Sequence, residues 1–281
     1  MNLRRRIWNF YVTTVRKFYV KTKHNNCKSD IRVIENTVLC FVTIAFNNEF
    51  LIEEQIRLMK KYITNSNYVH IVVDNSSDKK KRGTIKAVCA KANIPYFSLP
   101  FNWFSKIDKR PSYSHGLAMN WVYYNLIKKI KPSIFGFLDH DIFPIKPYSL
   151  LQKIGNQCFY GRLVDKTPDN YPKKLWYLWA GFCFFNFDSI KYLDINFMPC
   201  KVDDIYLDTA SSNYFPLYSK YDIESLHFPA PVVEEFFREG NVYHSDLLQF
   251  IDDDWIHTIN GSNWKKVKDK DDFLRNFLRQ Y

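Results

Sequence analysis

The 281-residue sequence predicts an α/β fold in which helices flank a central, mostly parallel sheet. Apolar runs without alternation indicate strands that are covered on both faces. Segments with apolar residues at helical spacing separate these runs, as in β-α-β units with right-handed crossovers. No glycine- or serine-rich linker and no internal repeat divides the sequence, so its length fits one large domain.

Strands and helices are predicted to alternate through the first half of the chain. Buried strands are expected over 37–46 (TVLCFVTIAF), 68–73 (YVHIVV), 95–99 and 134–138 (IFGFL). Helices are expected over 49–62, 84–92 and 114–129. After residue 141 the predicted segments become shorter and more aromatic, at 158–162, 176–187 and 206–218.

The sequence divides into three predicted parts. Residues 1–36 form a basic amphipathic segment, residues 37–264 form the α/β domain, and residues 265–281 form a charged tail with a helix. In the first part, aromatic and apolar residues recur at helical spacing among arginines and lysines. This pattern has two interpretations, a helix lying in a membrane interface or a helix packed on the domain with its basic face in solvent.

The formal net charge of +11 predicts a partner that carries negative charge. Nucleic acid, an anionic bilayer and phosphorylated substrates all qualify. The positive charge is concentrated in the first 35 residues and in a predicted loop at 79–82, and no nucleic-acid-binding module is recognisable. Nucleic acid is therefore not the expected partner, although a basic nucleic-acid-binding protein stays an alternative.

Cysteine usage and hydropathy bear on the compartment. The six cysteines form no Cys-X-X-Cys pair, which favours a reduced, intracellular protein over a disulfide framework. No apolar stretch approaches the roughly 20 residues that span a bilayer. The sequence thus predicts a cytoplasmic protein, and contact of residues 1–30 with an anionic membrane surface would make it peripheral.

Carboxylates follow two of the predicted strands. Asp74 ends the 68–73 strand, and Asp139 and Asp141 follow the 134–138 strand. Open parallel sheets bind ligands at the carboxyl ends of their strands. Two aspartates separated by one residue can hold Mg²⁺ or Mn²⁺ and leave coordination positions for phosphate oxygens. The alternatives are a turn or helix cap for Asp74 and a solvated loop for the other two.

The segments VVDNSS, SHGLAMNW and FLDHD, placed after buried strands, resemble the GT-A glycosyltransferases, especially family-2-like members with an Asp-X-Asp motif. The resemblance covers about residues 37–150 and implies the GT-A fold. It implies metal binding by Asp139 and Asp141, with His140 in a position where many relatives carry Asp or Ala. The donor contacts that it implies are Ala45, Phe46, Asn47, Asp74, Ser114, His115, Gly116 and Asp139.

The second half of the chain must supply the remaining groups. By resemblance, Asp208 would open a helix and act as the catalytic base, with Asp204 and Asp203 as alternatives. Trp179 and Gly181 would bind the acceptor sugar, unless this aromatic segment belongs to the core. His257 would be a third metal ligand, with His244 as its alternative.

These features together predict a metal-dependent enzyme. It would move a sugar from a nucleoside-diphosphate sugar to a hydroxyl of a glycan or lipid-linked acceptor, with inversion implied by the resemblance. A nucleotidyltransferase, another nucleotide-binding α/β enzyme and an inert scaffold of the same fold remain alternatives. A methyltransferase is disfavoured, because no glycine-rich loop follows the first strand.

Overall fold

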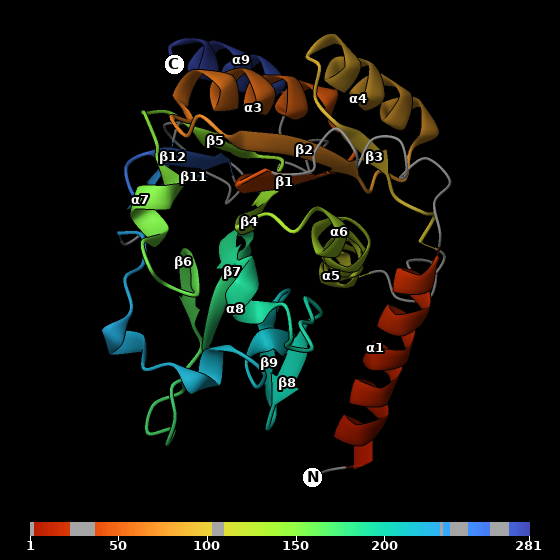
Figure 1. Ribbon diagram of the computed structural model, residues 1–281, viewed down its shortest axis with the longest axis vertical. Coiled ribbons are helices and arrows are strands. Elements are labelled where there is room, and N and C mark those ends of the chain that lie inside the picture. The colour runs from red at the N-terminus through yellow and green to blue at the C-terminus, as the bar shows by residue number, and fades with distance from the viewer. Residues whose placement is uncertain (1–2, 23–36, 103–109, 231–232, 237–246, 259–269) are drawn as a thin grey trace.

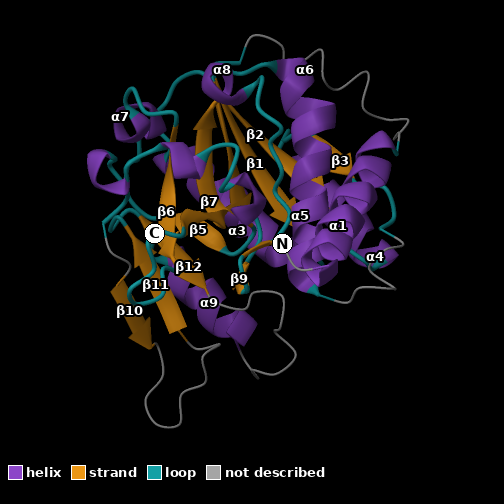
Figure 2. Cartoon of the chain, turned by 90° about the horizontal axis from the view of Figure 1, so that it is seen from below, coloured by secondary structure: helices purple, strands orange, loops and turns teal. Residues whose placement is uncertain are grey.

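A six-stranded sheet forms the centre of the molecule, with strand order β3-β2-β1-β4-β7-β6 (Figures 1 and 2). The computed structural model describes residues 3–22, 37–102, 110–230, 233–236, 247–258 and 270–281. Strands β1 (Leu39–Ala45), β2 (Tyr68–Asp74), β3 (Tyr96–Ser98) and β4 (Ile134–Asp139) are parallel. Strand β7 (Trp176–Asn186) runs antiparallel to β4 and to β6 (Phe159–Asp165). The predicted α/β class with a mostly parallel sheet is confirmed.

Helices cover both faces of this sheet (Figure 1). One face carries α3 (Glu49–Tyr62), α4 (Lys79–Lys91) and α9 (Lys270–Arg279). The other carries α5 (Pro111–Val122), which continues through a π-helical segment (Tyr123–Ile127) into α6 (Lys128–Ile130). The basic residues at 79–82 lie in the first turns of α4 rather than in a loop, because Asp78 caps that helix by accepting hydrogen bonds from two of its backbone amides.

A second sheet joins the end of the chain to the central sheet. It consists of β10 (Val233–Phe236), β11 (Leu247–Ile251), β12 (Trp255–Thr258) and β5 (Ile142–Pro144), in that order and all antiparallel. Strand β5 begins directly after Asp141. Pairing of β5 with β12 therefore brings residues near 257 to the carboxyl end of β4.

The segment 206–218 contains no helix that opens at Asp208, contrary to the prediction. It contains β9 (Ile205–Leu207), which pairs with β8 (Cys200–Val202), and then a 3-10 turn at Ser211–Asn213. Ala210 adopts a left-handed backbone conformation with φ of 74°, which interrupts any helix that would start at Asp208. The remaining short elements are α7 (Leu150–Ile154), α8 (Phe187–Ile190), Tyr218–Lys220 and Ile223–Ser225.

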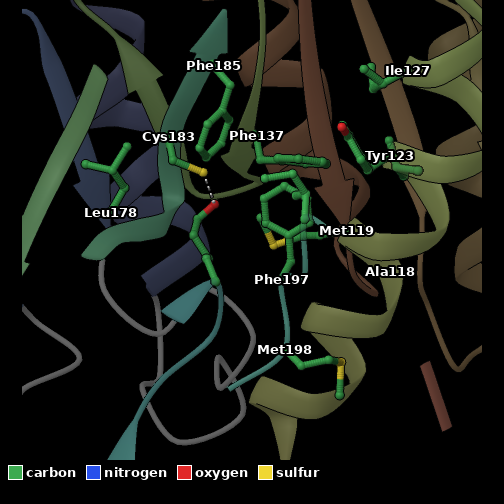
Figure 3. Packing of buried hydrophobic residues seen from close by; sticks show 14 of the residues in the cluster. Ala118, Met119, Tyr123, Ile127, Phe137, Leu178, Cys183, Phe185, Phe197 and Met198 are labelled. Carbon is green, nitrogen blue, oxygen red and sulfur yellow. Dashed lines mark hydrogen bonds between the residues drawn. The ribbon is translucent and has the colours of Figure 1, made fainter. Parts of the chain in front are cut away.

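Aromatic side chains fill the core between the sheet and α5 (Figure 3). Phe137 on β4 packs edge-on against Phe197, with ring centroids 5.0 Å apart, and Phe185 on β7 lies 5.9 Å from Phe197. These rings are buried, so many of the aromatic side chains in the second half of the chain are core residues. The core thus anchors β4, whose carboxyl end carries the site described below, and β7, whose middle residues lie beside that end.

Helix α1 (Leu3–Lys21) packs along the α5 side of the domain (Figure 1). Val12, Val15 and Tyr19 are buried there. Arg16 is buried too, and its guanidinium donates to the carbonyl of Ile195 at 3.0 Å. These contacts support the interpretation of a helix packed on the domain. Within the described residues, no helix has the length and apolar character needed to cross a membrane.

Candidate metal and diphosphate site

Three strand ends lie side by side at one edge of the central sheet. In the β1–β2 pairing Ala45 is opposite Asp74, and in the β1–β4 pairing Ile44 is opposite Asp139. Neighbouring strands are about 4.8 Å apart, so the Asp74 and Asp139 positions are roughly 10 Å apart. The structure thus brings together the strand-terminal carboxylates that the sequence identified.

The acidic turn, Asp139-His140-Asp141, connects β4 to β5. The backbone amide of Thr258 on β12 donates to the Asp141 carbonyl at 2.9 Å, which holds the turn against the second sheet. Burial, together with the negative charges of Asp141 and Asp208 and against the opposing effect of His140, raises the pKa of Asp139 to about 7. Two carboxylates so close in a poorly solvated place favour a bound cation or proton.

The side chain of His257 faces Asp141, with its Nε2 atom 3.6 Å from Oδ1 of the carboxylate. Its Nδ1 atom lies 2.8 Å from Oε1 of Gln249, and Arg162 donates to the same oxygen at 2.9 Å. A guanidinium can only donate, so Gln249 must present its carbonyl oxygen and Nδ1 of His257 must carry a proton. In the neutral ring, Nε2 is then the nitrogen with the lone pair, and it is turned toward Asp141.

Trp179 and Arg162 form a wall beside this pair. The Trp179 ring lies 4.6 Å from the His257 ring, and the Arg162 guanidinium lies 5.0 Å from the Trp179 ring. Trp179 therefore contacts the predicted metal ligand directly. Arg162 and Gln249 were not predicted from the sequence, because only the pairing of their strands brings them to His257.

Gly181 on β7 provides the space that the Asp139 carboxylate occupies. A Cβ atom at this position would lie 2.4 Å from Oδ2 of Asp139 and 2.4 Å from the Trp179 ring. Both approaches are far shorter than a van der Waals contact. The predicted role of Gly181 in acceptor binding stays a prediction, but its contact in the structure is with Asp139.

Replacing Gly181 with Ala is therefore expected to displace the Asp139 carboxylate or the Trp179 ring. We expect Mn²⁺ affinity to fall roughly 10- to 100-fold, as it does when groups that orient metal ligands are lost. Titration followed by electron paramagnetic resonance would measure this change. Gly83→Ala is the matched control, because a Cβ there meets nothing within 4 Å. Unchanged Mn²⁺ affinity in Gly181→Ala would contradict a metal role for Asp139.

His115 and Asp208 approach the acidic turn from other elements. Nδ1 of His115 on α5 lies 3.5 Å from Oδ1 of Asp139. Burial lowers the pKa of His115 to about 4, although the nearby carboxylates of Asp208 and Asp141 raise it. Its Nε2 atom is buried, with no hydrogen-bond partner among the described residues. Asp208 is exposed, and one of its oxygens accepts from the Thr209 amide at 2.7 Å.

The donor atoms present fit a divalent cation in an open site. Two atoms that each lie about 2.1 Å from one ion are about 3.0 Å apart at a right angle and about 3.4 Å apart at a tetrahedral angle. The 3.6 Å between His257 and Asp141 needs only a small adjustment to reach this range. Among the described residues no group of three or more histidine, cysteine or carboxylate side chains comes close enough together to hold a metal ion, so the pair Asp141 and His257 is the basis of this candidate site. An open site of few protein ligands leaves positions for phosphate oxygens.

The raised pKa of Asp139 predicts a pH-dependent cost in the metal-free chain. The folded state retains a proton at Asp139 between pH 4 and 7 that the unfolded state releases, so this group lowers stability as pH rises through that window. Asp139→Asn should therefore stabilise the chain by roughly 2 kcal/mol at pH 8 and by little at pH 4. Unfolding measured in chelator at both pH values tests this, and a stabilisation equal at both would contradict it.

The predicted nucleotide contacts lie at the β1 and β2 ends. The side-chain oxygen of Asn47 accepts a hydrogen bond from the Asp78 backbone amide, and the backbone amide of Asn47 donates to Ser76 Oγ at 2.7 Å. Asp74 is buried, and its two oxygens accept from the Ser76 amide at 2.8 Å and the Tyr96 hydroxyl at 2.7 Å. These bonds favour the alternative in which Asp74 shapes the turn. Ser114 Oγ accepts from Asn75 at 3.1 Å.

Other predicted site residues lie elsewhere or stay untested. Ala45 is buried in the core, and Phe46 beside it is half-buried. Gly116 is buried, and a Cβ there would lie 2.7 Å from the Phe197 carbonyl, so the close approach of α5 to the loop at Phe197 explains this glycine. Asp204 is exposed in the turn between β8 and β9. His244 lies outside the described residues.

No protein-family model and no curated protein matches the chain. Solved structures that are similar to it include a bifunctional glycosyltransferase, WbbM, at 14% identity over 56% of this chain and 32% of that one, with a TM-score of 0.37. The mannosyltransferase Ktr4p from S. cerevisiae is 8% identical over 64% of this chain and 66% of that one, with a TM-score of 0.37. The mannosyltransferase PcManGT from Pyrobaculum calidifontis, in complex with GDP-Man and Mn²⁺, is 12% identical over 64% of this chain and 52% of that one, also with a TM-score of 0.37. The chain spans 32% to 66% of these three structures, and similarity at this level is too weak to establish a shared activity.

Proposed function

We propose that this chain is a metal-dependent glycosyltransferase that moves a sugar from a nucleoside-diphosphate sugar to a hydroxyl of a glycan or lipid-linked acceptor. The observation that carries the proposal is the apposition of Asp141 and His257, 3.6 Å apart, at the carboxyl end of a parallel sheet. Gln249 fixes the protonated nitrogen of His257, so the remaining ring nitrogen and the carboxylate point at one another. Asp139 lies beside them in the same turn.

Each residue has a distinct part in the proposed reaction. Asp141 and His257, with Asp139, would hold Mn²⁺ or Mg²⁺. The cation would neutralise the negative charge that grows on the departing diphosphate. Asp208 would accept the proton of the acceptor hydroxyl, while the acceptor oxygen bonds to the sugar carbon and the bond from that carbon to the phosphate oxygen breaks. Attack opposite to the leaving diphosphate inverts the sugar carbon. Asp208 fits the base role because it lies close enough to the acidic turn for its negative charge to raise the pKa of both His115 and Asp139.

Thermal unfolding with a panel of ligands tests this function. Nucleoside diphosphates and nucleotide-sugars should raise the unfolding temperature in the presence of Mn²⁺ and much less in chelator, since a ligand of the folded state stabilises it. Release of free nucleoside diphosphate with transfer of the sugar should follow when an acceptor is added. No stabilisation by any nucleotide, with or without Mn²⁺, would contradict the proposal. Release of pyrophosphate instead would indicate nucleotidyl transfer.

The outer face of α1 is proposed to contact an anionic membrane surface. Phe10 and Phe18 are 73% and 66% exposed, and Lys17 and Lys21 are exposed on the side opposite the buried face. No acidic residue occurs in this helix. Exposed aromatics beside lysines suit the headgroup region of an anionic bilayer.

Charge reversal tests this contact without removing α1 from the core. Lys17→Glu combined with Lys21→Glu should weaken binding to phosphatidylserine-containing vesicles by at least about 1 kcal/mol per lysine, and should not affect binding to phosphatidylcholine alone. Lys80→Glu with Lys86→Glu on α4 is the matched control, since both lysines are exposed. Equal vesicle sedimentation of the two double variants would argue against a role for α1.

A further inference from the structure

A buried chain of hydrogen bonds runs from β2 through β1 and α3 to the acidic turn. Nε2 of His70 lies 2.8 Å from Oγ1 of Thr43, and Thr43 donates to Oε1 of Gln55 at 2.6 Å. Nε2 of Gln55 donates to the carbonyls of Asp139 and Ile142, at 2.8 Å and 2.7 Å. His70, Thr43 and Gln55 are each at most 3% exposed.

The chemistry of the end groups fixes the direction of every hydrogen bond in this chain. Backbone carbonyls only accept, so Gln55 must direct its amide nitrogen at Asp139 and Ile142 and its oxygen at Thr43. The Thr43 hydroxyl must then donate to Gln55, which leaves its oxygen to accept from His70. His70 is therefore the neutral tautomer with the proton on Nε2. Burial, with a smaller contribution from the positive charge of Lys60, lowers the pKa of His70 to about 3, so this neutral form persists at neutral pH.

The two carbonyls that Gln55 binds are the two ends of the acidic turn. Asp139 ends β4, Ile142 begins β5, and His140 and Asp141 lie between them. The carbonyl of Asp141 is held separately, by the Thr258 amide at 2.9 Å. The Gln55 side chain thus bridges the two ends of the turn, and the Thr258 amide on β12 binds the carbonyl of Asp141 between them.

We infer that Gln55 is a positioning residue that sets the backbone of the acidic turn, and that Thr43 and His70 lock the orientation of its amide. The inference that this positions metal ligands rests on the proposed function. In this network every polar atom of Thr43 and Gln55 is paired, and Nδ1 of His70 has no hydrogen-bond partner among the described residues. Buried hydrogen-bonded networks hold one arrangement, and loss of one member leaves its neighbours without partners. Thr43, Gln55 and His70 would then position Asp139 and Asp141 without contacting the metal ion.

Paired substitutions at Thr43 separate positioning from packing. Thr43→Val removes the hydroxyl and keeps the shape, whereas Thr43→Ser keeps the hydroxyl and loses a buried methyl group. We expect Thr43→Val and Gln55→Leu to weaken Mn²⁺ binding about tenfold, as loss of ligand-orienting partners does. Thr43→Ser should keep Mn²⁺ affinity within about twofold, even though it loses stability. Ile52→Val, a buried change on the same helix, is a second control for stability alone.

Three outcomes decide the inference. Mn²⁺ affinity that falls in Thr43→Val but not in Thr43→Ser supports positioning, whereas equal affinities would overturn it. If Gln55→Leu does not fold, the Thr43 pair still carries the test. If the unmodified chain binds no Mn²⁺, the proposed function fails, and the network is then tested by unfolding the double variant of Thr43→Val and Gln55→Leu. Destabilisation smaller than the sum of the single changes supports the network, and strict additivity contradicts it.

Discussion

Asp141→Asn is expected to lower metal-dependent sugar transfer by about 10³-fold, the loss of several kcal/mol of charge stabilisation at the diphosphate. Asparagine keeps the shape of the side chain but removes the charge that faces His257. Stability should not fall, because Asp141 is one cause of the raised pKa of Asp139 and its neutral replacement relieves that repulsion. The measurement is turnover of a nucleotide-sugar at saturating Mn²⁺, together with the unfolding temperature.

Asp188→Asn is the control for this substitution, since the Asp188 side chain on α8 is 77% exposed and forms an ion pair with Lys191. It should leave turnover unchanged. Retention of most activity in Asp141→Asn at low Mn²⁺ concentration would remove Asp141 from the metal site. If Asp141→Asn does not fold, His257→Gln is the second variant that tests the metal site. It should likewise lose Mn²⁺ affinity and metal-dependent sugar transfer.

Asp208→Asn is expected to lower turnover by about 10²- to 10⁴-fold, the usual contribution of a general base. Mn²⁺ affinity should be retained within a few-fold. The reason is that the Asp208 charge has two opposing effects: it raises the pKa of Asp139, which disfavours the ionised, metal-binding form, and it attracts the cation. This combination of lost turnover and retained metal binding distinguishes a base from a metal ligand.

The alternative base, Asp204, supplies the matched control. It lies four residues earlier and is exposed in the β8–β9 turn, and Asp204→Asn should leave turnover unchanged. The reverse result, with Asp204→Asn inactive and Asp208→Asn active, would assign the base to the hairpin turn. A loss of Mn²⁺ affinity in Asp208→Asn would instead indicate that this carboxylate helps to bind the cation.

The local sequence determined the first half of the site. Apolar runs that do not alternate belong to strands buried on both faces, and such strands end where polar residues begin. This is why Asp74 and Asp139 could be placed at strand ends, and why the parallel pairing of their strands with β1 brings these ends to one edge of the sheet. The helix at 49–62 was likewise predicted with its observed bounds, since its apolar spacing is regular.

The second half could not be predicted to the same degree, because it depends on pairing between distant segments. Asp208 was expected to open a helix, but it follows a short strand and precedes a left-handed Ala210. The left-handed backbone conformation of Ala210 is incompatible with a helix, although the apolar spacing of the segment is helical. The candidate base therefore rests on its electrostatic proximity to His115 and Asp139 rather than on its secondary structure.

By itself, then, the sequence determined the α/β class, the positions of the first strands along the chain and the carboxylates at their ends, because periodicity and burial act between near neighbours in the chain. Only the tertiary structure decided which residues join them. Thr258 contacts Asp141 across 117 residues of sequence, and Gln55 contacts Asp139 across 84. Such contacts arise when strands and helices pack, and the Asp139-His140-Asp141 turn gains its partners from that packing.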